Sequence, residues 1–409
     1  MDQAGNQMIN KKRVVVIGQG YVGLNLAVYS AKNYLTYGFD ISSKIVSNLK
    51  AGQSHIEDIA DSEIQIALKE NRYIPTNNEA DIEGADIYVI AVPTPLDDAR
   101  QPDLSYVASA AELIARVASK TSLVINESTS YPGTLREFIK PLIEANSNVP
   151  HLFAASPERV DPGRTDFTQE NTPRLVGAVD DESLDAVYEF YSSFCNVVHK
   201  VSSPEIAEAA KIFENTFRQV NIALVNEFAQ IAHALGIPVR ETLDAANTKP
   251  YGFMRFNPGA GVGGHCIPVD PSYLSYAAER AGISARFIDL ANRVNLDMGR
   301  YVIDRVMADN SGSIKDKKVQ IIGVAYKSNI ADVRETPAKL VSDELKKQGA
   351  QVTWHDPLVE TWQGTRSSDL GSEIAIVITV HDLMDLEAVF SSAPYVFDTT
   401  GKVKNAVQL

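Results

Sequence analysis

Short apolar runs alternate with longer amphipathic stretches in the first third of the chain, and turn-forming residues flank each run. The runs are Arg13–Ile17, Tyr37–Asp40, Ala85–Val92, Ser122–Asn126 and His151–Ala155. Runs of this length that are rich in β-branched residues predict strands buried on both faces, as in a parallel sheet. Because helical patterns separate them, we expect a doubly wound α/β domain here.

Residues 204–236 follow a different pattern, with an amphipathic run that contains no Gly or Pro between Pro204 and Gly236. Pro204 suits the first position of a helix, and the Gly236-Ile237-Pro238 sequence ends one. A helix of this length would extend about 50 Å at ~1.5 Å per residue. Helices that long and apolar on more than one side often join domains or pack against a second subunit.

A second alternation of strand and helix patterns begins at Lys317. The predicted strands are 317–322, Gln351–Trp354, Ile374–Val380 and Tyr395–Asp398, and Thr336–Gln348 is a predicted helix. This pattern indicates a second, smaller α/β domain at the carboxyl end of the chain.

The composition is that of an ordinary globular protein, with 44% hydrophobic and 22% charged residues among 409. The 38 basic and 52 acidic residues give a net charge of −14, which argues against nucleic acid or an anionic membrane as the main partner. An anionic ligand therefore requires a local cluster of basic groups. With two cysteines and no signal peptide, we expect a cytoplasmic protein. No apolar run reaches the ~20 residues that a membrane span needs, so we expect no span.

The strand that ends at Ile17 runs directly into the glycine-rich sequence Gly18-Gln19-Gly20-Tyr21-Val22-Gly23. In dinucleotide-binding folds the three glycines allow a tight turn, close approach of a pyrophosphate and close packing of helix on strand. Asp40 ends the next strand, where an acid binds the ribose hydroxyls and favours NAD over NADP. The alternative is a glycine-rich turn with an unrelated Asp.

Two prolines follow the third strand, in Ala91-Val92-Pro93-Thr94-Pro95. They stop the strand and stiffen a loop at the carboxyl end of the sheet, where open α/β sheets bind ligands. A rigid turn without a binding role remains the alternative for the prolines.

The most unusual segment is 257–271, where four glycines precede Cys266. Glycines let the backbone approach a ligand closely, and a thiol among them with a basic neighbour can act as a nucleophile. The adjacent His265 could be a base, although a lone His beside a cysteine is more often incidental. Cys195 lies in an apolar run and is expected to be a buried small hydrophobe. No metal-ligand spacing is present, so we predict no metal site.

Lys211, Asn215 and Arg218 share one stripe of the predicted long helix, at i, i+4 and i+7. Glu158 follows a predicted strand and could face the same cleft. The alternatives are a solvated helix face for the first three and a surface salt bridge for Glu158.

Seven motifs in order make the chain resemble the UDP-glucose/GDP-mannose dehydrogenase family. They are GQGYVG at 18–23, VPTP at 92–95, ESTSYPGT at 127–134, SPER at 156–159, AAKIFENTFR at 209–218, GGHCIPVDP at 263–271 and GVAYKSNIADVRETP at 323–337. The resemblance implies an α/β fold with two Rossmann-like doubly wound domains joined by a long central helix. It assigns residues 1–202 to NAD, 203–310 to a helical dimerisation region with the cysteine loop, and 311–409 to the UDP-sugar.

The resemblance also implies a four-electron oxidation in a homodimer. The C6 hydroxymethyl group of a nucleotide sugar becomes a carboxylate, with two NAD⁺ and one water consumed. Cys266 resembles the family nucleophile, which captures the aldehyde as a thiohemiacetal and is then acylated as a thioester. Lys211 matches a lysine that stabilises oxyanions near C6, and Asn215 matches its hydrogen-bonding partner.

Three further residues match family positions with catalytic roles. Asp270 matches an acid that handles protons of the first oxidation together with Lys211. Glu158 matches the residue that assists thioester hydrolysis. Thr129 matches one that positions water and contacts NAD.

The resemblance implies two sets of binding residues. Those for NAD are Gly18, Gly20, Tyr21, Val22, Gly23, Asp40, Val92, Pro93, Thr94, Thr129, Gly263 and Arg334. Those for the UDP-sugar are Glu158, Arg159, Lys211, Asn215, Arg218, Arg255, Phe256, Gly259, Gly261, Lys327 and Arg334. Gly323 opens a second turn that lacks three spaced glycines, so no second dinucleotide site is expected.

The motif that contains Arg159 resembles the branch of the family that oxidises UDP-N-acetylhexosamines. We expect Arg159 and its loop to accommodate the acetamido group, and His265 replaces a small residue typical of UDP-glucose enzymes. UDP-N-acetylglucosamine is the first choice; UDP-N-acetylgalactosamine, UDP-N-acetylmannosamine and UDP-glucose remain alternatives.

Two departures from the family pattern leave individual contacts open. In some members the facing subunit supplies an arginine to the site. In this chain the candidates for its counterpart are Arg255 and Lys249. The final predicted strand lacks the usual following basic residue. Two other functions compete with the four-electron reaction: a single-step dehydrogenase with a structural Cys266, and a non-catalytic nucleotide-sugar sensor.

Overall fold

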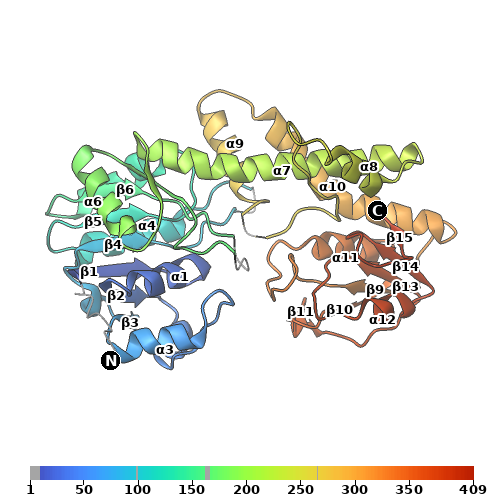
Figure 1. The fold of residues 1–409 in the computed structure, drawn as a ribbon, viewed down its shortest axis with the longest axis horizontal. Helices are drawn as coiled ribbons and strands as arrows, with labels where there is room; N and C mark the ends of the chain where they lie inside the picture. Colours follow the sequence, from blue (N-terminus) through green and yellow to red (C-terminus); the bar gives the residue numbers. More distant parts are fainter. Residues whose placement is uncertain (1–9, 98–99, 162–165, 265) are drawn as a thin grey trace. The chain divides into compact units, whose positions relative to one another are not determined.

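The computed structural model describes residues 10–97, 100–161, 166–264 and 266–409, which form two compact units (Figure 1). The first unit ends at Phe213 and the second begins at Glu214. Each unit is built on a mostly parallel sheet with helices against both faces. The predicted α/β class with two Rossmann-like domains and a long helix is confirmed.

The sheet of the first unit has eight strands in the order β3-β2-β1-β4-β5-β6-β7-β8. Their bounds are β1 Asn10–Ile17, β2 Tyr34–Phe39, β3 Tyr73–Thr76, β4 Ile87–Ile90, β5 Leu123–Asn126, β6 Leu152–Ala155, β7 Arg174–Ala178 and β8 Val198–Lys200. All neighbours are parallel except β6 and β7. The sequence pattern predicted five of these strands and missed β3, β7 and β8, which are short and lie at or near the sheet edges.

Alternate residues of β1 face opposite sides of the sheet. Val14 and Val16 pack with α1 (Tyr21–Ser30) and α6 (Asp181–Ser192). Val15 and Ile17 pack with α4 (Ser105–Val117), η2 (Leu135–Ile139) and α5 (Lys140–Asn146). The remaining short helices of the unit are α2 (Ser43–Lys50), α3 (Asp61–Lys69) and η1 (Glu79–Ile82). Burial on both faces explains why the strands have unbroken apolar runs.

Helix α7 spans Pro204–Ala234, as the sequence pattern predicted, and contains the point at which the two units divide. Farther along it, Leu224 and Ile231 are exposed. Exposed apolar side chains on a long helix agree with a subunit contact. The homodimer itself stays a prediction.

The second unit begins with the rest of α7, followed by α8 (Val239–Ala246), α9 (Asp270–Arg280) and α10 (Arg286–Asp309). Its sheet has the order β10-β9-β13-β14-β15, all parallel. The bounds are β9 Lys318–Ile322, β10 Gln351–His355, β13 Ile374–Val377, β14 Tyr395–Asp398 and β15 Val407–Gln408. A small hairpin joins β11 (Thr361–Trp362) to β12 (Thr365–Arg366).

Two layers of helix cover this second sheet. Helices α10 and α11 (Pro337–Lys347) pack on one face, and α12 (Leu386–Ser391) packs on the other. The strands and the helix predicted from the sequence are present within three residues at each end. The predicted divisions at 202/203 and 310/311 stay predictions.

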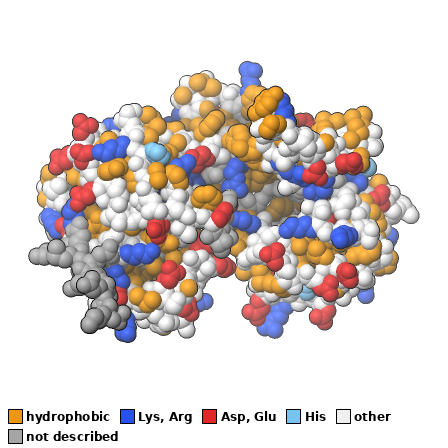
Figure 2. All heavy atoms as spheres, in the orientation of Figure 1, with side chains coloured by type: hydrophobic (Ala, Val, Ile, Leu, Met, Phe, Trp, Pro, Cys, Tyr) orange, Lys and Arg blue, Asp and Glu red, His pale blue; other side chains and the backbone are white. Residues whose placement is uncertain are grey.

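On the face of the molecule drawn in Figure 2, Lys and Arg side chains lie among Asp and Glu side chains. Within the described ranges, none of the helices combines the length and apolar character that crossing a bilayer requires.

Candidate functional site

The loop after β1 has the geometry that a dinucleotide needs. Gly18 has φ +91°, and a Cβ there would lie 2.5 Å from the Ala91 carbonyl oxygen. A Cβ on Gly23 would lie 1.8 Å from the Gly18 carbonyl oxygen, so helix α1 packs directly on the turn. At Gly20, by contrast, an added Cβ would meet no atom within 4 Å. Two glycines therefore close the turn, and the third leaves open space at the start of α1.

Asp40 lies where β2 ends, beside this turn. Its two carboxylate oxygens accept hydrogen bonds from the backbone N–H groups of Gln19 and Ser42, both at 2.8 Å. The side chain is partly exposed, so its remaining lone pairs can accept hydrogen bonds from ribose hydroxyls. The open space at Gly20, the backbone N–H groups at the start of α1 and this carboxylate together fit the pyrophosphate and ribose of NAD.

The neighbouring loops at the same edge of the sheet are tied together. The Ser128 hydroxyl donates to the Val92 carbonyl at 2.8 Å, and the Val92 N–H donates back to it at 3.0 Å. This pair links the Val92–Pro95 loop to the segment that carries Thr129. Thr94 is buried and Thr129 is partly exposed. The loops after β4 and β5 therefore form one wall beside the dinucleotide loop.

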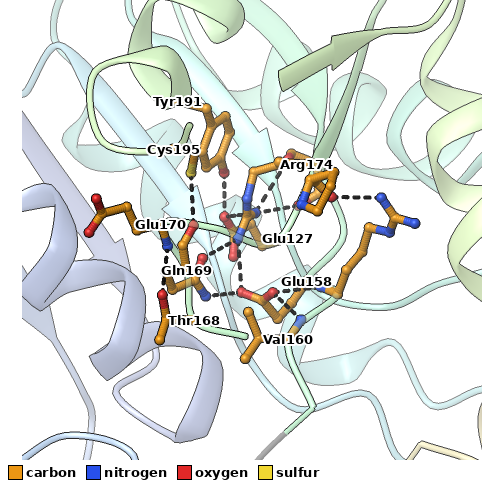
Figure 3. Close-up of polar contacts among 12 residues, drawn as sticks. Glu127, Glu158, Val160, Thr168, Gln169, Glu170, Arg174, Tyr191 and Cys195 are labelled. Carbon is orange, nitrogen blue, oxygen red and sulfur yellow. Dashed lines mark hydrogen bonds and ion pairs between the residues drawn. The ribbon is translucent and has the colours of Figure 1, made fainter. Parts of the chain in front are cut away.

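Glu158 follows β6 and is held by four donors (Figure 3). The backbone N–H groups of Arg159 and Val160 donate to one of its oxygens at 2.5 and 2.7 Å. Arg174 donates to the other at 2.8 Å, and the Gln169 amide also donates to it. Burial by itself would raise the pKa of Glu158, but the Arg174 guanidinium and these N–H groups hold that pKa below its usual range. Glu158 is thus a buried carboxylate that stays ionised.

Arg174 also contacts a second buried carboxyl group, Glu127 (Figure 3). The guanidinium donates to Glu127 at 2.6 Å, and the Tyr191 hydroxyl donates to the same oxygen. The other oxygen of Glu127 is buried without a hydrogen-bond partner. Burial raises the pKa of Glu127 to about 7, against the attraction of Arg174. One cation therefore lies between two carboxyl groups with pKa values displaced in opposite directions.

A third buried acid, Glu208 on α7, holds the segment that follows Thr129. Its carboxyl oxygens accept hydrogen bonds from the N–H groups of Gly133 at 2.7 Å and Leu135 at 2.9 Å. Burial raises the pKa of Glu208 to about 8, although these two hydrogen bonds favour the ionised form. Because Glu208 is one turn of helix from Lys211, α7 fixes the loop and presents the lysine together.

In the second unit, Asn215 and Asp270 form a buried pair. The Asn215 amide donates to the Asp270 carboxylate at 2.5 Å, and both side chains are buried. Asp270 begins α9, and its N–H donates to the Cys266 carbonyl at 2.8 Å. Cys266 is partly buried. The structure therefore brings together three of the predicted catalytic residues, Cys266, Asn215 and Asp270, within the second unit.

The glycine-rich segment before the cysteine is constrained by its neighbours. The N–H of Gly259 donates to the Asn226 side chain at 2.9 Å. Gly261 has φ +132°, and the backbone at Gly264 donates to the Arg334 carbonyl at 3.3 Å. A Cβ on Gly263 would lie 2.7 Å from Pro337. These glycines let the segment pass closely over the region that contains Lys327 and Arg334.

The cationic residues predicted to bind the UDP-sugar differ in exposure and in their ion pairs. Arg255 forms an ion pair with Asp244, and Arg334 forms one with Asp332 at 2.6 Å. Lys327 is partly exposed, whereas Arg218 is exposed on α7. The prediction for His265 lies outside the described residues. Among those residues, no group of three or more His, Cys, Asp and Glu side chains is arranged to hold a metal ion.

Sequence reasoning missed Arg174, Glu127, Gln169, Tyr191 and Glu208. Glu127 begins the motif at 127–134, and Glu208 lies just before the motif at 209–218. Arg174 and Tyr191 lie in segments with no motif, so only the structure reveals their contact with Glu158 and Glu127. The roles assigned to the individual site residues stay predictions.

Models of three parts of one family match the chain in order. The NAD binding domain of the UDP-glucose/GDP-mannose dehydrogenase family matches residues 12–195. The central domain of that family matches 205–297, and its UDP binding domain matches 320–405.

Individual relatives agree with these matches. The chain is 36% identical to a UDP-N-acetyl-D-glucosamine 6-dehydrogenase of Pseudomonas aeruginosa, over 85% of this chain and 83% of that protein. It is 34% identical to a UDP-N-acetyl-D-mannosamine dehydrogenase of Pyrococcus horikoshii, over 90% of this chain and 89% of the other. A solved structure of a UDP-D-ManNAc dehydrogenase from P. horikoshii has a TM-score of 0.87 at 30% identity and covers 97% of this chain and 98% of that one. The predicted family, enzyme class and NAD cofactor are confirmed.

Proposed function

Because the chain belongs to the UDP-glucose/GDP-mannose dehydrogenase family of NAD-dependent UDP-sugar dehydrogenases, we propose that it oxidises C6 of a UDP-N-acetylhexosamine to a carboxylate. The reaction consumes one water and reduces two NAD⁺. NAD⁺, when bound in the loop after β1, accepts the hydride in each oxidation. UDP-N-acetylglucosamine is the proposed substrate.

The observation that carries this proposal is the arrangement around Cys266. The Cys266 carbonyl accepts the N–H of Asp270, whose carboxylate accepts the Asn215 amide. Cys266 therefore lies in the turn that leads into α9, four residues before a buried acid that accepts a hydrogen bond from Asn215. Such a thiol can add to an aldehyde while the acid and amide control protons and the oxyanion.

Water enters only at the last step, where Glu158 is the proposed base. Its carboxylate stays ionised, and when water replaces one of its four donors it can accept a proton from that water, whose oxygen then bonds to the thioester carbon. The carbon–sulfur bond breaks, its electron pair stays on the Cys266 sulfur, and the sugar leaves as a carboxylate. Lys211, buried on α7, is proposed to neutralise the oxyanion of each tetrahedral species.

The choice of sugar rests on Arg159 and on the relatives. The Arg159 guanidinium donates to the Pro173 carbonyl at 2.6 Å, which holds its loop beside Glu158. We propose that this loop faces the acetamido group. UDP-N-acetylmannosamine is the second candidate, because several relatives have names that refer to that sugar.

A panel of NADH measurements tests the proposal. With excess NAD⁺, UDP-N-acetylglucosamine should give two NADH per sugar and no free aldehyde. UDP-glucose, UDP-N-acetylgalactosamine and UDP-N-acetylmannosamine should react more slowly. Cys266→Ser should stop turnover after an ester-like adduct forms. One NADH per sugar with released aldehyde would refute the covalent mechanism, and full activity of Cys266→Ser would remove the assigned role of the thiol.

A further inference from the structure

Arg174 contacts two buried carboxyl groups, and the proposed reaction assigns a role to only one of them, Glu158. We propose that Glu127 is a positioning residue for the hydrolytic step, which acts through Arg174 to set the basicity of Glu158. This inference rests on the proposed role of Glu158 as the base. Glu127 itself would not touch the sugar.

The geometry supplies a direct connection between the two acids. Arg174 donates through one terminal nitrogen to Glu127 and through the other to Glu158, at 2.6 and 2.8 Å. The Arg174 side chain is 3% exposed, so water does not screen the interaction effectively. While Glu127 is neutral, the full positive charge of Arg174 acts on Glu158. When Glu127 ionises, the same charge is divided between two carboxylates, and Glu158 becomes a stronger base.

The other groups around Glu127 do not change charge near neutral pH. Tyr191 and Cys195 face it from α6 and from the turn after α6. Burial raises the pKa of Tyr191 well above 10 and that of Cys195 to about 11. Arg174 stays charged, because its two carboxylates raise its pKa although burial opposes them. Glu127, with its pKa near 7 and one oxygen without a partner, is therefore the member of the cluster that titrates there.

A stronger base removes the proton from water more readily, so thioester hydrolysis should accelerate as the pH rises through 7. We would follow the loss of the acyl group from Cys266 by rapid quenching and intact-protein mass spectrometry between pH 6 and 8.5. The wild-type rate should rise by roughly threefold beyond the effect of bulk pH. Glu127→Gln should match the wild type at pH 6, because the amide resembles the neutral acid, and should lack the rise.

The control is Glu170→Gln, which removes an exposed carboxylate from the same segment as Gln169 and should leave the profile unchanged. An identical profile for Glu127→Gln and wild type overturns the inference. A rate lowered equally at every pH also overturns it, because that result indicates a purely structural role.

A second measurement does not depend on activity. Infrared difference spectra of wild type minus Glu127→Gln, in which the Glu208 band cancels, should show a carboxylic-acid C=O band that disappears as the pH rises through 7. If that band is missing from the wild type, the inference fails while the proposed function stands. If instead Glu158→Gln hydrolyses its thioester at the wild-type rate, the proposed role of Glu158 fails separately.

Discussion

In both units a glycine turn follows a strand of the sheet, after β1 in the first unit and after β9 in the second, but the two turns differ in their hydrogen bonds. In the first unit the Gly18 N–H donates to the Phe39 carbonyl, and in the second the Gly323 N–H donates to the His355 carbonyl, both at 2.8 Å. Both glycines have positive φ, and an acid follows the next strand in each case. Asp40 is that acid in the first unit and Asp356 in the second.

The difference lies in how many hydrogen bonds each acid already accepts. Asp40 accepts two backbone N–H groups and is partly exposed. Asp356 is buried and accepts four, from Val324, Ala325, Leu358 and Val359.

His381 adds a fifth donor to Asp356. Its Nδ1 accepts the Asn329 N–H at 2.8 Å, so Nε2 carries the proton that is donated to Asp356 at 3.2 Å. Burial by itself would raise the pKa of Asp356, but His381 and the N–H groups hold it below its usual range. An acid saturated in this way fixes the loop that contains Lys327 and cannot bind a ribose. The same turn thus leaves room for a dinucleotide in one unit and is closed by hydrogen bonds in the other.

The largest expected effect comes from replacing the two acids by the same amide. Asp356→Asn turns an N–H₂ group toward buried donors and should lower the free energy of unfolding of the second unit by about 3 kcal/mol or more. Asp40→Asn should cost about 1 kcal/mol or less, because water can reach that site. Both tryptophans, Trp354 and Trp362, lie in the second unit, so the fluorescence change during urea unfolding measures it selectively. Equal losses for the two variants would contradict the comparison.

A smaller effect should appear in the pH dependence of stability. Glu208 stays protonated when folded until its pKa of about 8, whereas the unfolded chain ionises it far lower. The folded state therefore binds more protons, and the stability of the first unit should fall as pH rises, by about 2 kcal/mol between pH 6.5 and 8. Asp356 has a lowered pKa, so its contribution is complete above its unfolded pKa and is lost only in acid.

The two units can be followed separately in that experiment. Cys195 is buried in the first unit, so in a Cys266→Ser background a brief pulse of thiol reagent during urea unfolding reports on that unit alone. Tryptophan fluorescence reports on the second. Glu208→Gln should reduce the slope of the first unit to the part that Glu127 contributes, and a slope unchanged in this variant would refute the assignment to Glu208.

The smallest effect concerns cofactor affinity. Asp40→Asn should weaken NAD⁺ binding by roughly tenfold, about 1.4 kcal/mol, and reduce the preference over NADP⁺, because a carboxylate no longer faces the ribose. Asp356→Asn, measured under conditions where it is folded, should leave the dissociation constant for NAD⁺ unchanged. Calorimetric titration of both variants tests this, and weaker NAD⁺ binding by Asp356→Asn would show that the second turn also holds the dinucleotide.

The sequence predicted the parts of the fold that depend on local pattern. Apolar runs such as Val14–Ile17 and the uninterrupted stretch from Pro204 fix strands and a helix by themselves. Strand β8 was missed because three residues, two of them exposed, have no apolar signal. The absence of three spaced glycines after Gly323 led us to expect no second dinucleotide site, which stays a prediction, and it did not indicate the hydrogen bonds that Asp356 and His381 make there.

The sequence predicted those residues of the candidate site that lie in recognisable motifs. It did not predict residues that reach the site from distant segments without a motif. Gly18, Asp40 and Cys266 stand out from their neighbours in the sequence. Arg174 and Tyr191 do not, because their significance arises from the antiparallel placement of β7 and from α6, which bring both side chains to Glu127. Long-range contacts of this kind are set by tertiary packing rather than by spacing.

The burial of Cys195 bears on how this protein would respond to oxidants. Its sulfur donates to the Gln169 carbonyl at 3.2 Å inside an apolar cluster, and its raised pKa keeps it as the unreactive thiol. Peroxide reacts with thiolates that it can reach. Of the two cysteines, Cys266 should therefore be the one that peroxide oxidises, with sulfenic acid as its first product.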